Sequence, residues 1–265
     1  MPDVSSNPGA PDSASIFELK LATLPLNAPF VWLRKGWQDF VRQPLTGLFY
    51  GLCFFLMGHA LWWVFAEAPA YVMALSAGFL LMGPFLCLGL YHASRELEQG
   101  RVAPLAETLQ AWRPARAAIA LFAGVLLVLE LLWGRASLVV FAVSFDLPPG
   151  GQVTLSQLLA LENLAFLITF TLVGGVFASL IFVTSVIAIP MILDRQVDAV
   201  SAALTSVRAC VQNPAVMLLW GALITTLVAL CMLPYFAGLL LAGPVVGHAS
   251  WHAYRSIVAS GTSQA

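Results

Sequence analysis

Apolar residues are grouped into long stretches along the chain, and short polar segments separate these stretches. A helix needs about 20 apolar residues to cross the ~30 Å hydrocarbon core of a bilayer. The pattern therefore predicts an all-α polytopic membrane helix bundle with six transmembrane helices. We expect these spans at residues 45–66, 71–92, 117–141, 164–190, 215–233 and 235–254. The last two are the shortest, and a re-entrant hairpin is the alternative to two full crossings there.

Part of the second expected span recurs in the sixth. Ala77–Arg95 reads AGFLLMGPFLCLGLYHASR and Ala237–Arg255 reads AGLLLAGPVVGHASWHAYR, with nine of the nineteen positions identical. Four spans separate the start of one copy from the start of the other, so both copies cross in the same direction. The sequence therefore predicts a parallel internal repeat of spans 1–2 and 5–6. Its copies cover about residues 30–95 and 197–255.

Each copy of the repeat begins with an amphipathic stretch. Apolar residues recur there at helical spacing, opposite charged or polar ones. They are Phe30, Leu33, Trp37 and Phe40 in the first copy and Val197, Val200, Leu204, Val207 and Val211 in the second. Pro44 and Pro214 follow, each suited to the first turn of the next helix. We expect two cytoplasmic amphipathic helices that lie on the inner leaflet. Helices that cap the bundle are the alternative.

The composition excludes a soluble globular protein. Sixty per cent of the residues are hydrophobic, only 9% are charged, and the mean hydropathy is +0.88. Ordinary soluble domains carry about 25% charged residues. We therefore expect the lipid bilayer as the partner, and no nucleic acid.

The positions of the basic residues indicate the orientation. Eleven of the twelve Lys and Arg residues fall on one side of the expected spans, because the alternate loops contain none. Since basic loops stay in the cytoplasm, both termini are expected there, in a multi-pass protein of the bacterial inner membrane. We expect a disordered tail at residues 1–28, the membrane domain at 29–259 and a second tail at 260–265.

Some residues within the expected spans are unusual for a membrane helix. Gly83, Pro84, Gly243 and Pro244 occupy corresponding positions of the two copies and predict helix kinks. Glu130 and Arg135 are charges inside the third span, and Glu162 stands at the outer start of the fourth. A charge at mid-membrane costs roughly 3 kcal/mol, so we expect an ion pair that faces the bundle interior. A polar pocket or proton path is the alternative.

A polar cluster is expected at the cytoplasmic ends of spans two, four and six. Its members are Arg95, Arg255, Asp194, Asp198, His92 and His252. Each arginine stands three residues after a histidine, and both acids follow span four. An unpaired arginine at a partly desolvated boundary is costly, so we expect at least one Arg–Asp contact.

The remaining chemistry-bearing residues give weak signals. His59, His248 and His252 are candidates for a haem site, because imidazole is a common haem ligand. The four cysteines are scattered without metal-ligand spacing, and motifs of hydrolases and nucleotide-binding proteins are missing from the sequence. We expect no metal, no cofactor and no enzymatic activity, with haem as the alternative.

Four segments resemble an uncharacterised bacterial family of six-span integral membrane proteins, classified as a domain of unknown function. They are PFVWLRKGWQDFVRQP, GFLLMGPFLCLGLYHASRELEQG, IPMILDRQVDAVSAALTSVRACVQNP and GPVVGHASWHAYR. The resemblance runs from about Phe30 to Val258 and implies the six-span topology. Members are sometimes labelled putative cytochrome c oxidase subunit. A haem-copper catalytic subunit would need about a dozen spans and six histidine ligands, whereas this chain has four histidines.

The sequence therefore predicts a non-enzymatic accessory, assembly or small-molecule-handling component of the membrane. A haem-bearing or haem-associated subunit of a respiratory oxidase and a small solute transporter are the two alternatives. A homodimer or a place in a respiratory complex is the expected form of association beyond the bilayer.

Overall fold

The computed structural model describes residues 19–67, 72–145 and 160–258, and the side chains of all these residues except 65–82. The described residues are almost wholly helical and include no strand. This agrees with the predicted all-α class. The longer helices are α2 (Ala28–Arg42), α3 (Pro44–Glu67), α4 (Val72–Glu98), α6 (Arg116–Ser144), α8 (Leu164–Ser185), α9 (Ala188–Arg195), α10 (Ala199–Gln212), α11 (Pro214–Met232) and α12 (Leu239–Val258).

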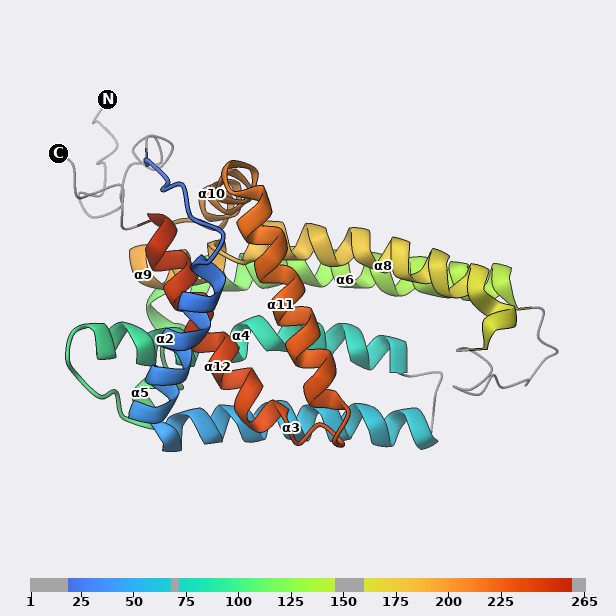
Figure 1. Cartoon of the computed structure of the whole chain (residues 1–265), viewed down its shortest axis with the longest axis horizontal. Coiled ribbons are helices and arrows are strands. Elements are labelled where there is room, and N and C mark those ends of the chain that lie inside the picture. Colours follow the sequence, from blue (N-terminus) through green and yellow to red (C-terminus); the bar gives the residue numbers. More distant parts are fainter. Residues whose placement is uncertain (1–18, 68–71, 146–159, 259–265) are drawn as a thin grey trace, which may run out of the picture.

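The helices α3, α4, α6 and α8 run lengthwise through the molecule, and α6 and α8 extend beyond the others (Figure 1). The helices α2, α11 and α12 are inclined to them (Figure 1). The short helices α5 (Leu105–Thr108) and η2 (Arg113–Ala115) connect α4 to α6. We call the end of the molecule formed by α2, α5 and α9 the basic end, because arginines and lysines flank these elements.

By length and composition, four helical segments of the described residues could cross a membrane. They are Pro44–Val64, Leu105–Ser144, Leu161–Arg195 and Pro214–Met232. They contain most of the first, third, fourth and fifth expected spans. The second and sixth expected spans fall on α4 and α12, and these two crossings stay predictions. Most of α12 from Gly247 onward is buried, and this part carries His248 and His252, unlike a lipid-facing span.

The fourth expected span does not continue as one helix to residue 190. The helix α8 ends at Ser185, and the separate helix α9 begins at Ala188. Ser206 of α10 bridges the break, because its hydroxyl accepts from the Ile187 amide at 3.2 Å and donates to the Val183 carbonyl at 2.7 Å. The break therefore leaves these two backbone groups satisfied.

The two helix–proline–helix joints are alike. Gln43 and Asn213 end α2 and α10 with nearly the same backbone angles, φ −129° and ψ 61° against φ −126° and ψ 53°. The order of buried and exposed residues along Val41–Tyr50 is the same as along Val211–Trp220. The wider packing differs: α12 lies along α2 and α3, whereas α4 packs on α6, α12, α3 and α9.

The apolar faces of α2 and α10 point away from the protein. Phe30, Trp37 and Val41 of α2 are all about half exposed or more, and so are Val200 and Val211 of α10. The opposite faces, which carry small and polar residues, are buried against the bundle. Within the predicted apolar faces only Phe40 and Val197 are buried. An outward apolar face is the arrangement of a helix that lies in a membrane interface.

Glycines allow α12 to approach α2 and α3 closely. A Cβ added at Gly36 would lie 2.5 Å from the Val245 carbonyl oxygen, and one at Gly51 would lie 2.1 Å from the Leu240 carbonyl oxygen. Both distances are shorter than any real contact, so only glycine fits at these two positions. The predicted kink positions Pro84 and Pro244 lie inside the helices α4 and α12, which continue through them.

The described part of the expected N-terminal tail is docked on the bundle. The Leu24 amide donates to Asn213 Oδ1 at 2.8 Å, and Asn213 Nδ2 donates to the Ala22 carbonyl at 3.0 Å. The Ala22 amide donates to the Ile257 carbonyl at 3.0 Å. The rest of this tail, the C-terminal tail and most of the loop at 142–163 lie outside the described residues.

Candidate functional site

A buried hydrogen-bond network joins α2, α4 and α12 near the basic end. Asp39 of α2 accepts from Ser94 Oγ of α4 at 2.8 Å and from His252 Nε2 of α12 at 2.7 Å. All three side chains are buried. The glycine at position 36, one turn before Asp39, brings α2 close enough to α12 for this contact.

His248 extends the network into the bundle. Its Nδ1 lies 2.8 Å from Ser94 Oγ, and the residue is fully buried. Since a carboxylate can only accept, the Ser94 proton points to Asp39, and His248 Nδ1 must carry the proton that Ser94 accepts. The hydrogen-bond partners thus assign His248 to the tautomer that is protonated at Nδ1.

The acidity of Asp39 reflects two opposing effects. Burial raises the pKa of this carboxyl, whereas the hydrogen bond and charge of His252 and the hydrogen bond from Ser94 lower it. The bonds outweigh the burial, and the pKa lies below its ordinary value of 3.8. Asp39 is therefore ionised at neutral pH and acts as the fixed acceptor of the network.

The expected contact between an arginine and an aspartate occurs at α12. Arg255 Nη1 lies 3.9 Å from Asp194 Oδ2, and Arg255 Nε donates to Glu98 Oε2 at 3.0 Å. Asp194 also accepts from the Tyr254 hydroxyl at 2.6 Å, which is its tighter contact. Three helices, α4, α9 and α12, are joined by these bonds.

Asp198 does not join this cluster. Its carboxylate caps α10 and accepts from the amides of Val200 and Ser201 at 3.0 and 2.9 Å. Burial raises the pKa of Asp198, but the hydrogen bonds from Ser201 and Val200 outweigh this effect and the pKa is lowered. Its role is that of a helix N-cap.

Sequence reasoning missed four members of the two networks, Asp39, Ser94, Glu98 and Tyr254. Asp39 gave one signal, its place on the polar side of the first amphipathic stretch. The structure buries Asp39 against α12, whereas Arg34 and Lys35 stay exposed.

A cavity of about 180 Å³ reaches the Asp39–His252 pair from the surface of α2. Its other lining residues are Lys35, Gln38, Arg42, Leu97 and Glu98. Acidic and basic groups are both present, so charge alone does not select one ligand class here.

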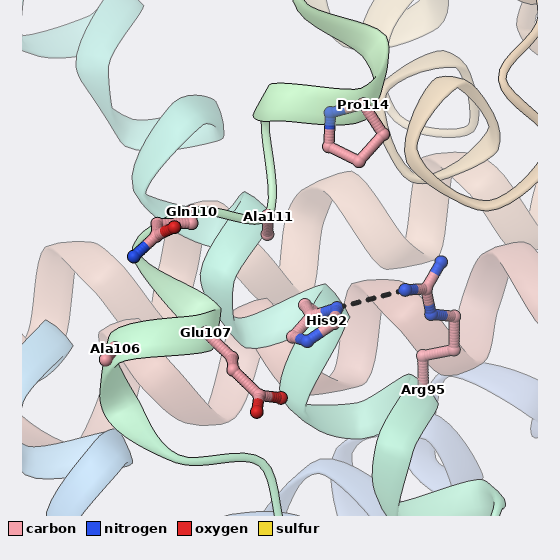
Figure 2. A pocket seen from close by; sticks show the side chains of 7 residues that line it. All are labelled: His92, Arg95, Ala106, Glu107, Gln110, Ala111 and Pro114. Atoms are coloured by element: carbon pink, nitrogen blue, oxygen red, sulfur yellow. Dashed lines mark hydrogen bonds between the residues drawn. The ribbon is translucent and has the colours of Figure 1, made fainter.

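A larger cavity, of about 270 Å³, lies between the end of α4 and the α5–η2 connection. It is lined by His92, Arg95, Ala106, Glu107, Gln110, Ala111 and Pro114. Figure 2 shows the side chains of His92 and Arg95 side by side, with the Glu107 side chain close to His92 on the side away from Arg95. Arg95 Nη2 lies 3.1 Å from His92 Nδ1.

His92 keeps a buried polar atom without a partner. A guanidinium can only donate, so Nδ1 of His92 accepts from Arg95, and the proton of the neutral ring resides on Nε2. Among the described residues, His92 Nε2 and Arg95 Nε are buried and have no hydrogen-bond partner. Buried polar groups are nearly always paired, so two unused donors in one cavity mark a candidate binding site.

The structure does not bring the intramembrane charges together. Glu130 is buried, and its Oε2 atom has no hydrogen-bond partner among the described residues. Arg135 and Glu162 are exposed. Five residues at 3.6 per turn place Glu130 and Arg135 on different faces of α6, which explains the separation.

Of the haem candidates, His252 and His59 contact other protein groups, whereas His248 has Ser94 at Nδ1 and, among the described residues, no hydrogen-bond partner at Nε2. His252 has Nε2 on Asp39 and Nδ1 at 3.8 Å from Glu98. His59 lies 3.1 Å from the Phe55 carbonyl through Nδ1, and its ring contacts Phe236. No group of three or more His, Cys, Asp or Glu side chains in the described part of the chain is arranged to hold a metal ion.

The part of the chain that contains the larger cavity has a family assignment. Residues 72–194, a little under half of the chain, match the family described as "Predicted integral membrane protein (DUF2189)". For this segment the resemblance to an uncharacterised membrane family is confirmed. No curated protein and no solved structure matches the chain. The fold and the family match together define an integral membrane protein with several apolar helices.

Proposed function

We propose that the protein is a non-enzymatic, multi-pass component of the bacterial inner membrane that handles a small molecule at its cytoplasmic face. The observation that carries this proposal is the cavity at His92 and Arg95. His92 Nε2 and Arg95 Nε have no hydrogen-bond partner among the described residues, so a ligand could supply the acceptor. The cavity lies at the basic end, and basic loops face the cytoplasm. The ligand would therefore enter from the cytoplasm.

The topology that we propose has six spans and a parallel repeat. The matched joints at Gln43 and Asn213, and the repeated burial order after them, support two copies of one unit. With α4 and α12 as the second and sixth spans, the four candidate spans become six. An even number of crossings puts both termini on the same side of the membrane, and the basic loops assign that side to the cytoplasm.

The two amphipathic helices fit this orientation. On α2 the exposed apolar residues are flanked by Arg34, Lys35 and Arg42, which are also exposed. Basic residues beside a lipid-facing apolar stripe match the anionic inner leaflet. We propose that α2 and α10 lie in this leaflet and hold the basic end at the membrane surface.

The proposal of a non-enzymatic protein is supported by the geometry of Ser94. A serine nucleophile gives its proton to a histidine base and must be reached by substrate. Ser94 is fully buried and gives its proton to Asp39. The Ser–His–Asp group is therefore suited to holding three helices together.

We do not propose haem binding, because the contacts of His252 are with two carboxylates and those of His59 with a carbonyl and an aromatic ring. The two cavities described above lie near the basic end, and neither favours the alternative of a solute transporter. Association as a homodimer or with a respiratory complex stays a prediction.

A ligand screen tests the small-molecule role. Purified protein would be heated in detergent with compounds from four classes: anions, cations, zwitterions and neutral sugars. At least one class should raise the melting temperature of the wild type and of Ala117→Trp, which is exposed outside the cavity. Ala106→Trp, which fills the cavity mouth, should abolish the rise. A rise that survives in Ala106→Trp, or none with any class, would contradict the proposal.

A further inference from the structure

The repeat places two histidine–arginine pairs in the same register but gives them different surroundings. His252 Nε2 meets the Asp39 carboxylate at 2.7 Å, and Arg255 Nε meets the Glu98 carboxylate at 3.0 Å. The equivalent atoms of His92 and Arg95 meet no acceptor among the described residues. One copy thus holds carboxylates where the other holds an open cavity.

The acids near His92 do not supply the missing acceptor. Glu96 forms its close ion pair with Arg101, and its other oxygen lies 3.8 Å from Arg95 Nε, beyond hydrogen-bond distance. Glu107 is exposed and lies near the His92 ring in Figure 2, but it forms no hydrogen bond with His92 Nε2. The remaining lining side chains, apart from Gln110, are alanine and proline.

The free donors define the ligand chemistry. The imidazole Nε2–H and the guanidinium are both donors, and a guanidinium matches the two oxygens of a carboxylate or phosphate. Arg95 is held in place by His92 on one side and by the Leu193 carbonyl at 3.5 Å on the other. Its orientation is therefore fixed before a ligand arrives.

We infer that the cavity binds a small oxyanion, a carboxylate or phosphate group, which takes the place that Asp39 and Glu98 hold in the second copy. This inference rests on the proposed function, because it names the ligand class of the same cavity. The volume of about 270 Å³ admits a small molecule that carries such a group. The exposed Glu107 opposes a simple anion and would favour a ligand that also bears a cationic group.

Equilibrium dialysis of radiolabelled inorganic phosphate tests the inference, with full-length protein in nonionic detergent at constant ionic strength. The wild type should bind one phosphate per chain. Arg95→Gln and His92→Asn should each weaken binding by about tenfold or more, because the first removes the charged guanidinium and the second has no donor at the position of Nε2. Arg116→Gln, an exposed arginine outside the cavity, should leave binding unchanged.

Glu107→Gln provides a test that does not require the fold to tolerate a substitution of a buried residue, because Glu107 is exposed. Removing this exposed acid should tighten phosphate binding, since it removes a like charge from the cavity wall. No phosphate binding by the wild type would overturn the inference, as would equal weakening by Arg116→Gln or no gain in Glu107→Gln. If a cation or a neutral sugar binds in the ligand screen and phosphate does not, the proposed function stands and the inference fails.

A phosphate could come from the cytosol or from a lipid headgroup. Repeating the dialysis in phospholipid nanodiscs and comparing it with nonionic detergent distinguishes these sources. Equal affinity in both supports a soluble oxyanion. Loss of phosphate binding in the nanodiscs, where phosphorylated headgroups compete for the cavity, assigns the oxyanion to a lipid.

Discussion

Replacing Asp39 by asparagine should be among the most destabilising polar changes in the chain. The side chain is 5% exposed and accepts from Ser94 at 2.8 Å and from His252 at 2.7 Å. Asparagine keeps the shape, but it carries no charge and its amide nitrogen cannot accept a hydrogen bond. Removing one member of a buried ion pair costs about 3–5 kcal/mol. Because one acceptor oxygen remains, we expect a loss of about 3 kcal/mol in the free energy of unfolding.

Unfolding followed by tryptophan fluorescence in detergent measures this loss. Asp198→Asn is the matched control, because asparagine is as good a helix N-cap as aspartate and the expected change is near zero. A double-mutant cycle of Asp39→Asn with Ser94→Ala should show coupling, since the two side chains share one hydrogen bond. Strict additivity, or equal losses in Asp39→Asn and Asp198→Asn, would refute the account of the network.

Other predictions follow from the same contacts. Gly51→Ala should destabilise the protein, because its Cβ would overlap the Leu240 carbonyl, whereas Gly124→Ala, with nothing within 4 Å of its Cβ, should change the melting temperature little. The pKa of Asp39 is lowered in the folded protein. The stability that the ionised carboxylate gives to the fold is therefore complete above pH 3.8, and it is lost as the pH falls through the lower pKa of the folded state. The difference in free energy of unfolding between the wild type and Asp39→Asn should therefore shrink as the pH falls below 3.8. Tyr254→Phe should loosen α9 from α12, which limited proteolysis near residue 195 would detect.

The sequence pattern predicted the elements better than their contacts. The helical spacing of Phe30 and Trp37 indicated an amphipathic helix, and the structure has one there with these residues exposed. The pattern could not show that the opposite face buries Asp39, because the partner His252 lies 213 residues away. Such a contact depends on how α2 and α12 pack, which periodicity does not encode.

The contacts of the other site residues could be predicted from the sequence only in part, for similar reasons. Arg255 and Asp194 were brought to one region by the expected ends of their helices, and the structure places them 3.9 Å apart. The tighter partner, Tyr254, gave no signal as an aromatic residue in an apolar helix. The open cavity at His92 could not be predicted either, since its far wall comes from the irregular α5–η2 connection.

The most direct test of the central claim is the side of the membrane to which the His92–Arg95 cavity opens. The four free cysteines would be replaced by alanine, and single cysteines introduced at Ala106, on the cavity, and at Leu161, which is 86% exposed before α8. An impermeant maleimide should label Leu161→Cys in intact cells, and should label Ala106→Cys only in inverted membrane vesicles. Labelling of Ala106→Cys in intact cells would place the cavity outside the cytoplasm and contradict the account.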